Sequence, residues 1–375
     1  MSTPVYFADL RTGHRENLFG KLTRLLDLAG IDRIVGNGDL TAIKIHFGEK
    51  GGHAFVRPPF IRRIVDRVKE LHGKPFLTDS STLYPGQRKE AVSALTCAIE
   101  NGFAYAVVGA PLIMSDGLRG HSARRIAIAG ELLTATDIGA EIIDADVLLT
   151  VSHFKCHEIS GFGGAIKNLA MGCSSREGKL EQHSVSAPTV NQRCTVCGAC
   201  LKACAHGAIT VQAPQASIDI DKCTGCGRCI TICADKAIDI NWDEAPPTIM
   251  KKMAEYALGA TTGKAGKTLY VSFVTQVSPA CDCYGHSDAP IVADQGILVA
   301  TDPVAIDQAC ADLVNRAPGL ADSALQSGHE AGGDKFRGVY PQIDWETTLE
   351  HGEKIGLGSR DYTLVSLEPK SDKGW

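Results

Sequence analysis

The sequence predicts an α/β protein, in which a discontinuous domain with a mixed or mostly parallel sheet carries an inserted α+β module. Two observations predict this fold. Short apolar or alternating runs that favour strands are followed by amphipathic segments that favour helices, as in sheets covered by helices. Between residues 188 and 243 this alternation gives way to a cysteine-rich repeat. We therefore expect one α/β domain formed by residues 1–187 and 244–375, with residues 188–243 inserted between its two parts.

Residues 1–187 contain five predicted strands and three predicted helices. The strands are expected at Val5–Ala8, Leu40–Phe47, Pro75–Thr78, Tyr105–Val108 and Asp146–Ser152. The helices are expected at Asn17–Ala29, Phe60–Leu71 and Arg88–Asn101. The first helix places four leucines on one face, and the second follows a pair of prolines, which are tolerated in the first helical turn.

Residues 244–375 continue the same alternation. A helix is expected at Pro247–Leu258, strands at Thr268–Val277 and Ile297–Ala300, and a last helix that ends at Asn315. Asp302 and Pro303 suit the start of this last helix, because an aspartate side chain accepts hydrogen bonds from the first free N–H groups and proline tolerates the first helical position.

The inserted segment contains the same C-x-x-C-x-x-C-x-x-x-C spacing twice, offset by 29 positions. This spacing is typical of bacterial ferredoxins with two [4Fe–4S] clusters, in which the fourth cysteine of each run binds the other cluster. The expected ligands of cluster one are Cys194, Cys197, Cys200 and Cys233. The expected ligands of cluster two are Cys223, Cys226, Cys229 and Cys204. The module is therefore predicted to transfer electrons.

Structural zinc, disulfides and buried thiols are the alternatives for these cysteines. Two four-membered runs with similar tails favour clusters over zinc, because each fourth cysteine is followed by a short turn and an alternating strand. One departure from the ferredoxin pattern is that Ala205 and Ala234 replace the usual proline after the fourth cysteine. Alanine leaves the backbone freer but removes no ligand.

Composition and charge exclude several classes of protein. The 375 residues are 44% hydrophobic, and there is no apolar run long enough for a membrane span. No export signal is visible near the N-terminus, so we expect a cytoplasmic protein whose cysteines bind metal and do not form disulfides. The formal net charge of −5 gives no electrostatic footprint for nucleic acid. The oligomeric state is not indicated by the sequence.

A second site is predicted outside the module, because four loops rich in polar residues each follow a predicted strand. These loops are residues 46–53, 79–82, 153–158 and 281–283. Ligands of α/β sheets collect beyond the carboxyl ends of the strands, so the four loops should converge if the strands are parallel.

Six cysteines lie outside the repeat. Cys97 and Cys310 fall within predicted helices and are expected to be small core residues. The other four form a candidate third metal site, for a third [4Fe–4S] cluster or zinc, with His153 and His157 as substitute ligands. These four are Cys156, Cys173, Cys281 and Cys283. The alternative is a set of unrelated loop thiols.

Several charged residues in these loops or elsewhere in the domain have two possible interpretations or no evident role. His46, Glu49, Lys50 and His53 could bind an anionic small molecule or could solvate a turn. Lys155 and Lys167 could tune a nearby cluster, although ordinary surface lysines are the preferred interpretation. Asp79 and Asp116 follow predicted strands without an evident partner, and neither is assigned a catalytic role.

The chain resembles a known family along nearly its whole length. The segments that carry the resemblance are KIHFGEKGG, PFLTDSSTLYPG, VGAPLIMSDGLRG, SHFKCHEISGFGGAIKNLAMGCSSREGK and CDCYGHSDAPIVADQGILVATDPVAID, together with the double cysteine run. They are similar to the ferredoxin-fused proteins of the domain of unknown function 362 family. The resemblance implies a cytoplasmic iron–sulfur protein of anaerobic bacteria or archaea and implies no particular reaction. Cys156 stands where this family more often has glycine. The scaffold is also distantly similar to lactate-racemase-type folds.

The leading hypothesis for function is a ferredoxin-like, low-potential electron carrier between cytoplasmic redox enzymes. No G-x-G-x-x-G or P-loop motif is present, which disfavours a Rossmann-type nucleotide site and an ATPase. One alternative is a redox enzyme whose module feeds electrons to a site lined by His46, His53, His153, His157 and Cys283. A second alternative is a scaffold or maturation protein whose clusters are structural.

Overall fold

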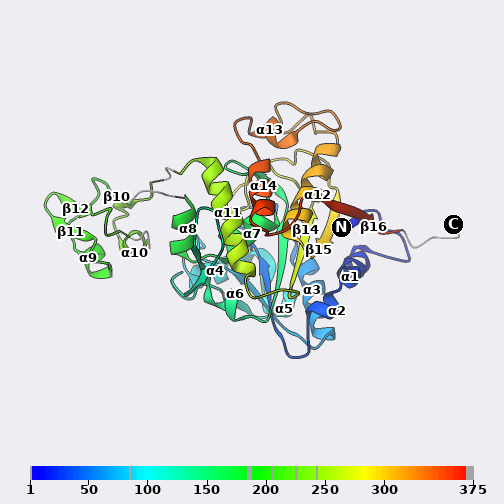
Figure 1. Cartoon of the computed structure of the whole chain (residues 1–375), viewed down its shortest axis with the longest axis horizontal. Coiled ribbons are helices and arrows are strands. Elements are labelled where there is room, and N and C mark those ends of the chain that lie inside the picture. Colours follow the sequence, from blue (N-terminus) through cyan, green and yellow to red (C-terminus); the bar gives the residue numbers. More distant parts are fainter. Residues whose placement is uncertain are drawn as a thin grey trace.

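The structure, a computed structural model, describes residues 2–83, 86–183, 188–204, 206–223, 227–241 and 244–368. Its largest element is an eight-stranded sheet in the order β16-β1-β15-β14-β7-β2-β3-β4 (Figure 1). The strands are β1 (Thr3–Asp9), β2 (Leu40–Ile45), β3 (Lys74–Asp79), β4 (Leu112–Met114), β7 (Val147–His153), β14 (Thr268–Val274), β15 (Gly296–Ala300) and β16 (Tyr362–Ser366).

Seven strands of this sheet point the same way, and only β15 runs against its neighbours. The predicted mixed, mostly parallel sheet is therefore confirmed. Strand β7 lies in the middle of the sheet and is buried at every position, because helices cover both faces.

Two layers of helices enclose the sheet. One face packs against α7 (Ala165–Cys173), α11 (Pro246–Thr261), α12 (Pro303–Arg316) and α14 (Glu346–Lys354) (Figure 1). The opposite face packs against α1 (Leu18–Leu28), α2 (Ile31–Ile34), α3 (Pro58–Glu70) and α5 (Tyr105–Val108). Successive strand residues such as Leu148 and Leu149 belong to opposite hydrophobic clusters, because side chains alternate across a strand.

Smaller elements surround these layers. They are α4 (Ala91–Ala98), the π-helical turn η1 (Ile99–Phe103), α6 (Ala140–Asp144), α8 (Arg176–His183), α13 (Lys335–Val339) and the hairpins β5 (Ala123–Ala127) with β6 (Ala135–Gly139) and β8 (Lys155–His157) with β9 (Gly161–Gly163). The predicted cap of α12 is confirmed, since the Asp302 carboxylate accepts hydrogen bonds from the backbone N–H groups of Val304 at 2.8 Å and Ala305 at 3.0 Å.

The predicted strand at Tyr105–Val108 is wrong, because these residues form the helix α5. Gly109, with φ at +74°, ends the helix in the left-handed conformation that glycine adopts readily. The strand that pairs with β3 comes only at Leu112–Met114. The β-favouring sequence of α5 is therefore overridden by its glycine cap and by packing against α3.

Residues 188–241 form a separate small core at one end of the molecule (left in Figure 1). The elements of this segment are β10 (Thr189–Val190), α9 (Ala199–Ala203), β11 (Ile209–Gln212), β12 (Gln215–Ile218), α10 (Arg228–Ile232) and β13 (Ile238–Asp239). Gly198 and Gly227, 29 positions apart, both have positive φ and directly precede α9 and α10. The sequence repeat is therefore also a structural repeat.

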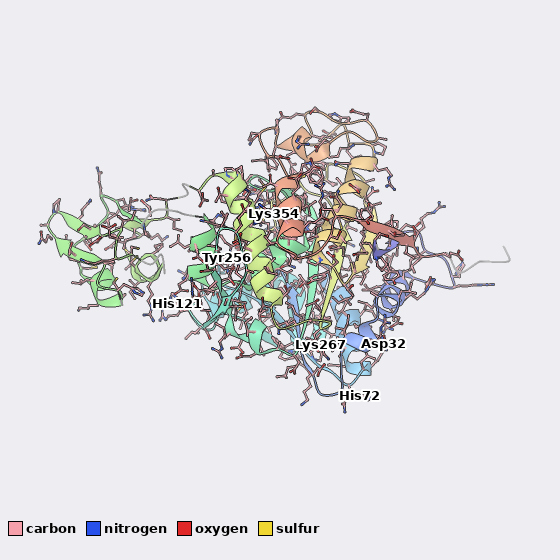
Figure 2. The ribbon with its side chains drawn as sticks, in the orientation of Figure 1. Asp32, His72, His121, Tyr256, Lys267 and Lys354 are labelled. Atoms are coloured by element: carbon pink, nitrogen blue, oxygen red, sulfur yellow. The ribbon has the colours of Figure 1, made fainter. Side chains whose placement is uncertain are left out.

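The chain enters this segment after α8 and leaves it before α11, and these two helices are tied together. The hydroxyl of Tyr256, labelled on α11 in Figure 2, donates a hydrogen bond to the Glu181 carboxylate of α8. Lys252 of α11 donates to the Glu181 carbonyl at 3.0 Å and pairs with Glu244 at 2.6 Å. Both connections to the segment are thus anchored on α11.

Among the described residues, no helix has the combined length and apolar character needed to cross a membrane.

Candidate functional site

A cavity of about 820 Å³ lies beyond the carboxyl ends of the parallel strands β2, β3, β7 and β14. Residues from all four polar loops line it, so their predicted convergence at this edge is confirmed. Five lysine and arginine side chains of the described residues also line it, namely Lys44, Arg88, Lys155, Lys167 and Lys179. The cavity is therefore rich in positive charge.

The loop of residues 46–53 packs on the loop that follows β14. A methyl group at Gly51, whose φ is +93°, would lie 2.7 Å from the carbonyl oxygen of Gly285. The Ser287 hydroxyl accepts hydrogen bonds at 3.3 Å from the backbone N–H groups of His53 and Ala54. His53 itself is exposed and does not line the cavity, which corrects its place in the predicted enzymatic site.

Buried charges at the ends of β2 and β3 form one network. Nζ of Lys44 lies 3.0 Å from the Asp79 carboxylate and donates to Asn168 of α7 at 2.6 Å. Arg88 lies 3.5 Å from Asp79 and 3.2 Å from the Glu49 carboxylate. These charges are buried, so each needs its partner to offset the loss of water. Asp79, left without a partner in the sequence analysis, is the centre of this network.

The side chain of Lys44 occupies space that a glycine leaves open. Lys44 lies next to the carboxyl end of β2 and is fully buried. A methyl group at Gly172 of α7 would collide with the Lys44 ammonium. Gly172 thus lets the lysine pass beneath α7 to reach Asp79.

His153, at the end of β7, is held at both ring nitrogens. Its Nε2 faces the Thr275 carbonyl at 2.7 Å, and its Nδ1 faces the Asp282 carboxylate at 2.9 Å. The second Asp282 oxygen lies 3.3 Å from Nζ of Lys155. The carbonyl and the carboxylate are both hydrogen-bond acceptors, so both ring nitrogens of His153 are engaged within the protein and neither has a free lone pair for the cavity. It fixes the position of Asp282 and cannot substitute as a metal ligand in this arrangement.

The sulfur of Cys281 is surrounded by hydrogen-bond donors. Nζ of Lys167 donates to it at 3.5 Å, and the backbone N–H of Cys283 donates at 3.4 Å. The hydrogen bond from Cys283, the charge of Lys167 and the ring of His157 hold the pKa of the Cys281 thiol well below its usual value, although burial opposes this. The surroundings of Cys281 therefore favour its thiolate form.

The partners of Cys281 respond to its charge. Burial acts to lower the pKa of Lys167, but the negative charge of Cys281 and the hydrogen bond that Lys167 donates to it raise this pKa above the usual value. The hydrogen bond to Cys281 raises the pKa of Cys283, so one thiolate and one thiol share the loop. Lys167 is thus half-buried and paired, which corrects its interpretation as a surface lysine. Lys155, which is buried, needs the same correction.

His157 supports this thiolate from the β8–β9 hairpin. Its Nδ1 accepts hydrogen bonds from the backbone N–H groups of Ile159 at 3.2 Å and Ser160 at 3.3 Å. The proton of neutral His157 is therefore on Nε2, on the side of Cys281. In this tautomer His157 is a donor and offers no metal-binding lone pair.

Lys179 supplies a weakly basic amine to the cavity wall. Its ammonium donates to the Ser80 hydroxyl at 2.7 Å and to the Ser174 carbonyl at 2.6 Å. Burial lowers the pKa of Lys179 to about 8, partly offset by the charges of Asp116 and Asp79. Burial also raises the pKa of Asp116 to about 6. Lys179 can therefore gain or lose a proton near neutral pH.

The four cysteines of the candidate third metal site lie in two different environments. Cys156 of β8 and Cys173 at the end of α7 are fully buried in the hydrophobic core, whereas Cys281 and Cys283 line the cavity. Burial raises the pKa of Cys156 above its usual value and that of Cys173 to about 12, as expected for apolar core thiols. Within the described ranges, no three His, Cys, Asp or Glu side chains are placed to hold one metal ion.

The cysteines of the repeat line two small cavities. The first is lined by Cys194, Cys197, Cys200 and Cys233. The second is lined by Cys204, Cys223 and Cys229, while Cys226 falls outside the described residues. Each cavity thus combines cysteines of both runs. None of the cysteines that the structure describes forms a disulfide.

Backbone donors reach several of these sulfurs. The N–H of Ala208 lies 3.4 Å from the Cys204 sulfur, and the N–H of Ala237 lies 3.2 Å from the Cys233 sulfur, at equivalent places in the repeat. The N–H of Ala216 lies 3.4 Å from the sulfur of Cys194. Such hydrogen bonds stabilise negative charge on sulfur.

The second small cavity lies against the α/β domain. A methyl group at Gly227, which lines this cavity, would lie 3.8 Å from a methyl carbon of Leu180 and 3.9 Å from one of Leu83. Leu83 lines the large cavity at the sheet edge. Leu83 therefore lines the large cavity and also lies close to Gly227, a residue of the second small cavity.

Sequence reasoning found the four loops of the site and singled out Lys155 and Lys167, but it missed the other basic residues, Lys44, Arg88 and Lys179. Lys44 alternates with apolar neighbours and reads as solvent-facing, and Lys179 lies in a polar helix. Gly172 was a usable signal, because the absence of a side chain at this position leaves room for Lys44.

A family model described as "Domain of unknown function (DUF362)" matches residues 41–312. No curated protein matches the chain. Among solved structures, the chain is similar to the lactate racemase apoprotein from Thermoanaerobacterium thermosaccharolyticum, with a TM-score of 0.38 and 13% identity over 73% of this chain and 51% of that one. It is also similar to a structural-genomics protein from Thermotoga maritima, with a TM-score of 0.36 and 9% identity over 93% of this chain and 60% of that one. The chain thus spans about half of the first protein and three fifths of the second.

Proposed function

The chain belongs to the DUF362 family, and from that premise and the geometry of its cavities we propose that it is a cytoplasmic iron–sulfur reductase. Residues 188–243 are proposed to be a ferredoxin-like module, and the cavity at the sheet edge is proposed to bind the molecule that is reduced. The leading sequence hypothesis, an electron carrier, did not include a substrate site. The cavity and its charged lining favour the enzyme.

The cysteines of the repeat fit two [4Fe–4S] clusters. One cluster would be held by Cys194, Cys197, Cys200 and Cys233, and the other by Cys204, Cys223, Cys226 and Cys229. Three features of the described cysteines support this fit: they form no disulfides, they line two small cavities, and backbone N–H groups donate hydrogen bonds to some of their sulfurs. The absence of a single-ion site is compatible with it, because the thiolates of a cubane bind different iron atoms.

The observation that carries the proposal is the position of Leu83 between Gly227 and the large cavity. When bound, the clusters supply electrons one at a time. Because Gly227 lies between the cluster-two cysteines in the sequence and close to Leu83 of the cavity wall, electrons from cluster two would enter the α/β domain near that wall.

The cavity's own residues suit a reduction that also consumes protons. Lys179, with a pKa of about 8, can hold a proton at Nζ near neutral pH and release it to a bound molecule. Cys281 presents a thiolate and Lys167 an ammonium to the same space. Helix α11 adds the apolar side chains of Ile249 and Met253 to the lining.

A single-turnover experiment tests this function. The anaerobic protein is reduced with dithionite, freed of excess reductant and mixed with small reducible carboxylates or with a redox protein, while the visible absorbance is followed. The enzyme predicts reoxidation by at least one small molecule, and slower reoxidation in Cys281→Ser and Lys179→Met at unchanged iron content. Cys310→Ser, a change to a core thiol outside the cavity, is the control. Reoxidation by redox proteins alone, unaffected by the cavity variants, would instead support the electron carrier.

A further inference from the structure

His46, at the end of β2, has one ring nitrogen without a partner. Its Nδ1 accepts a hydrogen bond from the backbone N–H of Gly48 at 3.0 Å. Its Nε2 is buried and has no hydrogen-bond partner among the described residues. The ring belongs to the wall of the large cavity. A buried polar atom of this kind is usually satisfied by a bound ligand or water.

The state of the His46 ring is fixed by its surroundings. Burial, together with the positive charges of Arg88 and Lys155, holds the pKa of His46 well below its usual value, so the ring is neutral. Since Nδ1 accepts from Gly48, the single proton of the neutral ring is on Nε2. His46 therefore presents an N–H donor that needs an acceptor.

The charges around this donor select the kind of acceptor. Arg88, Lys155 and Lys44 all act on the His46 ring as positive charges, and Cys281 is the negative charge that opposes them. Each of the three cations also has an anionic partner, respectively in Glu49, Asp282 and Asp79. These ion pairs hold the three cations in place beside the ring, where they can also contact a bound anion.

We propose that this corner of the cavity is an oxyanion-binding subsite, in which a carboxylate or phosphate oxygen accepts the Nε2 proton of His46 next to Arg88 and Lys155. The molecule that binds there is the substrate only if the proposed reductase function holds. Seated in this way, it would extend from the His46 corner towards Cys281 and Lys179, which line the same cavity. The subsite would therefore orient an anionic substrate by its charged end.

Binding measured without any electron transfer tests the subsite. Succinate, inorganic phosphate and the neutral analogue succinamide are titrated calorimetrically into the oxidised, cluster-containing protein. We expect succinate or phosphate to bind and succinamide to bind at least tenfold more weakly. Which of the two anions binds more tightly tells a carboxylate from a phosphate source. Equal binding of succinate and succinamide, or binding of none of the three probes, would overturn the proposal.

Variants of His46 provide the second arm. His46→Leu should weaken anion binding by about 10- to 100-fold, the effect of losing a hydrogen bond to a charged group. His46→Gln keeps an N–H donor and should restore part of the affinity. His53→Leu, in the same loop but exposed and outside the cavity, is the matched control. Anion binding that is equal in His46→Leu and His53→Leu contradicts the subsite.

The two proposals fail separately. Binding that depends on His46, without reoxidation by any small molecule, would retain the subsite and remove the reductase. Reoxidation by a small molecule that is unchanged in His46→Leu would retain the reductase and remove the subsite.

Discussion

The ammonium group of Lys167 lies 3.5 Å from the sulfur of Cys281 and donates a hydrogen bond to it. The two residues come from different parts of the chain, Lys167 from α7 and Cys281 from the loop after β14. Both line the same cavity. This pair places a thiolate and its counter-ion where the parallel strands end.

Removing the counter-ion should make the thiol less reactive. Lys167→Gln removes the positive charge that lowers the pKa of Cys281. This pKa should therefore rise, so that less thiolate is present at pH 7. We expect alkylation of Cys281 by iodoacetamide to slow by about tenfold, one pKa unit, in peptides quantified by mass spectrometry. The control is Lys50→Gln, a change to an exposed lysine that pairs with Glu100 at 3.2 Å. Equal rates in the two variants would exclude the ion pair.

Lys179 should titrate far below an ordinary lysine. Its pKa of about 8 predicts that acetylation by acetic anhydride reaches half its maximal rate near pH 8, whereas lysines of ordinary pKa need a pH above 10. The charge of Asp116 raises the pKa of Lys179, so Asp116→Asn should move the midpoint to lower pH. Mass spectrometry of the labelled peptides over pH 6–11 measures both. A midpoint above pH 10, or an upward shift in Asp116→Asn, would contradict this environment.

Glu255 should be among the most stabilising charged residues. Its buried carboxylate accepts hydrogen bonds from the backbone N–H groups of Glu131, Leu132 and Leu133 at 2.7–2.8 Å, and its other neighbour is Nε2 of His351 at 2.9 Å. Glu255→Ala leaves these donors without an acceptor and should lower the free energy of unfolding by about 3–5 kcal/mol.

Urea unfolding followed by tryptophan fluorescence measures this loss. The control is Glu350→Ala, which removes an exposed ion pair with Arg360 and should cost less than about 1 kcal/mol. Similar losses in the two variants would show that the Glu255 contacts contribute little.

Iron content should separate the cysteines of the repeat from those of the cavity. Two [4Fe–4S] clusters give about eight irons per chain. Cys156 and Cys173 are core residues and are not expected to bind iron together with Cys281, so Cys281→Ser should keep about eight irons. Cys200 is an expected ligand of cluster one, so Cys200→Ser should lose about half of the iron. Loss of iron in Cys281→Ser would instead indicate a metal site at the cavity.

Much of the fold follows from local sequence patterns. The strands Leu40–Ile45 and Val147–His153 and the helix capped by Asp302 were predictable, because apolar periodicity and cap residues act over short distances. The helix at Tyr105–Val108 was not predictable, because its residues favour a strand and its helical conformation depends on how α5 packs in the folded protein. The small strands β5 and β6 carry no apolar alternation strong enough to reveal them.

The candidate site was predictable in outline only. The positions of its loops follow from strand order, because the ends of parallel strands share one edge. The partners of its charges do not, since Lys44 meets Asn168 across 124 positions and Cys281 meets Lys167 across 114. Pairing over such separations depends on how α7 packs on the sheet. For the same reason, Cys156 and Cys173 could not be assigned to the core before that packing was known.

An anaerobic crystal structure with anomalous diffraction at the iron edge tests the central claim most directly. The account predicts two four-iron peaks, one among Cys194, Cys197, Cys200 and Cys233, and one beside Gly227 and Leu83 at the edge of the large cavity. Zinc or no metal at the repeat, or an iron peak for cluster two that is not adjacent to Leu83, would contradict it.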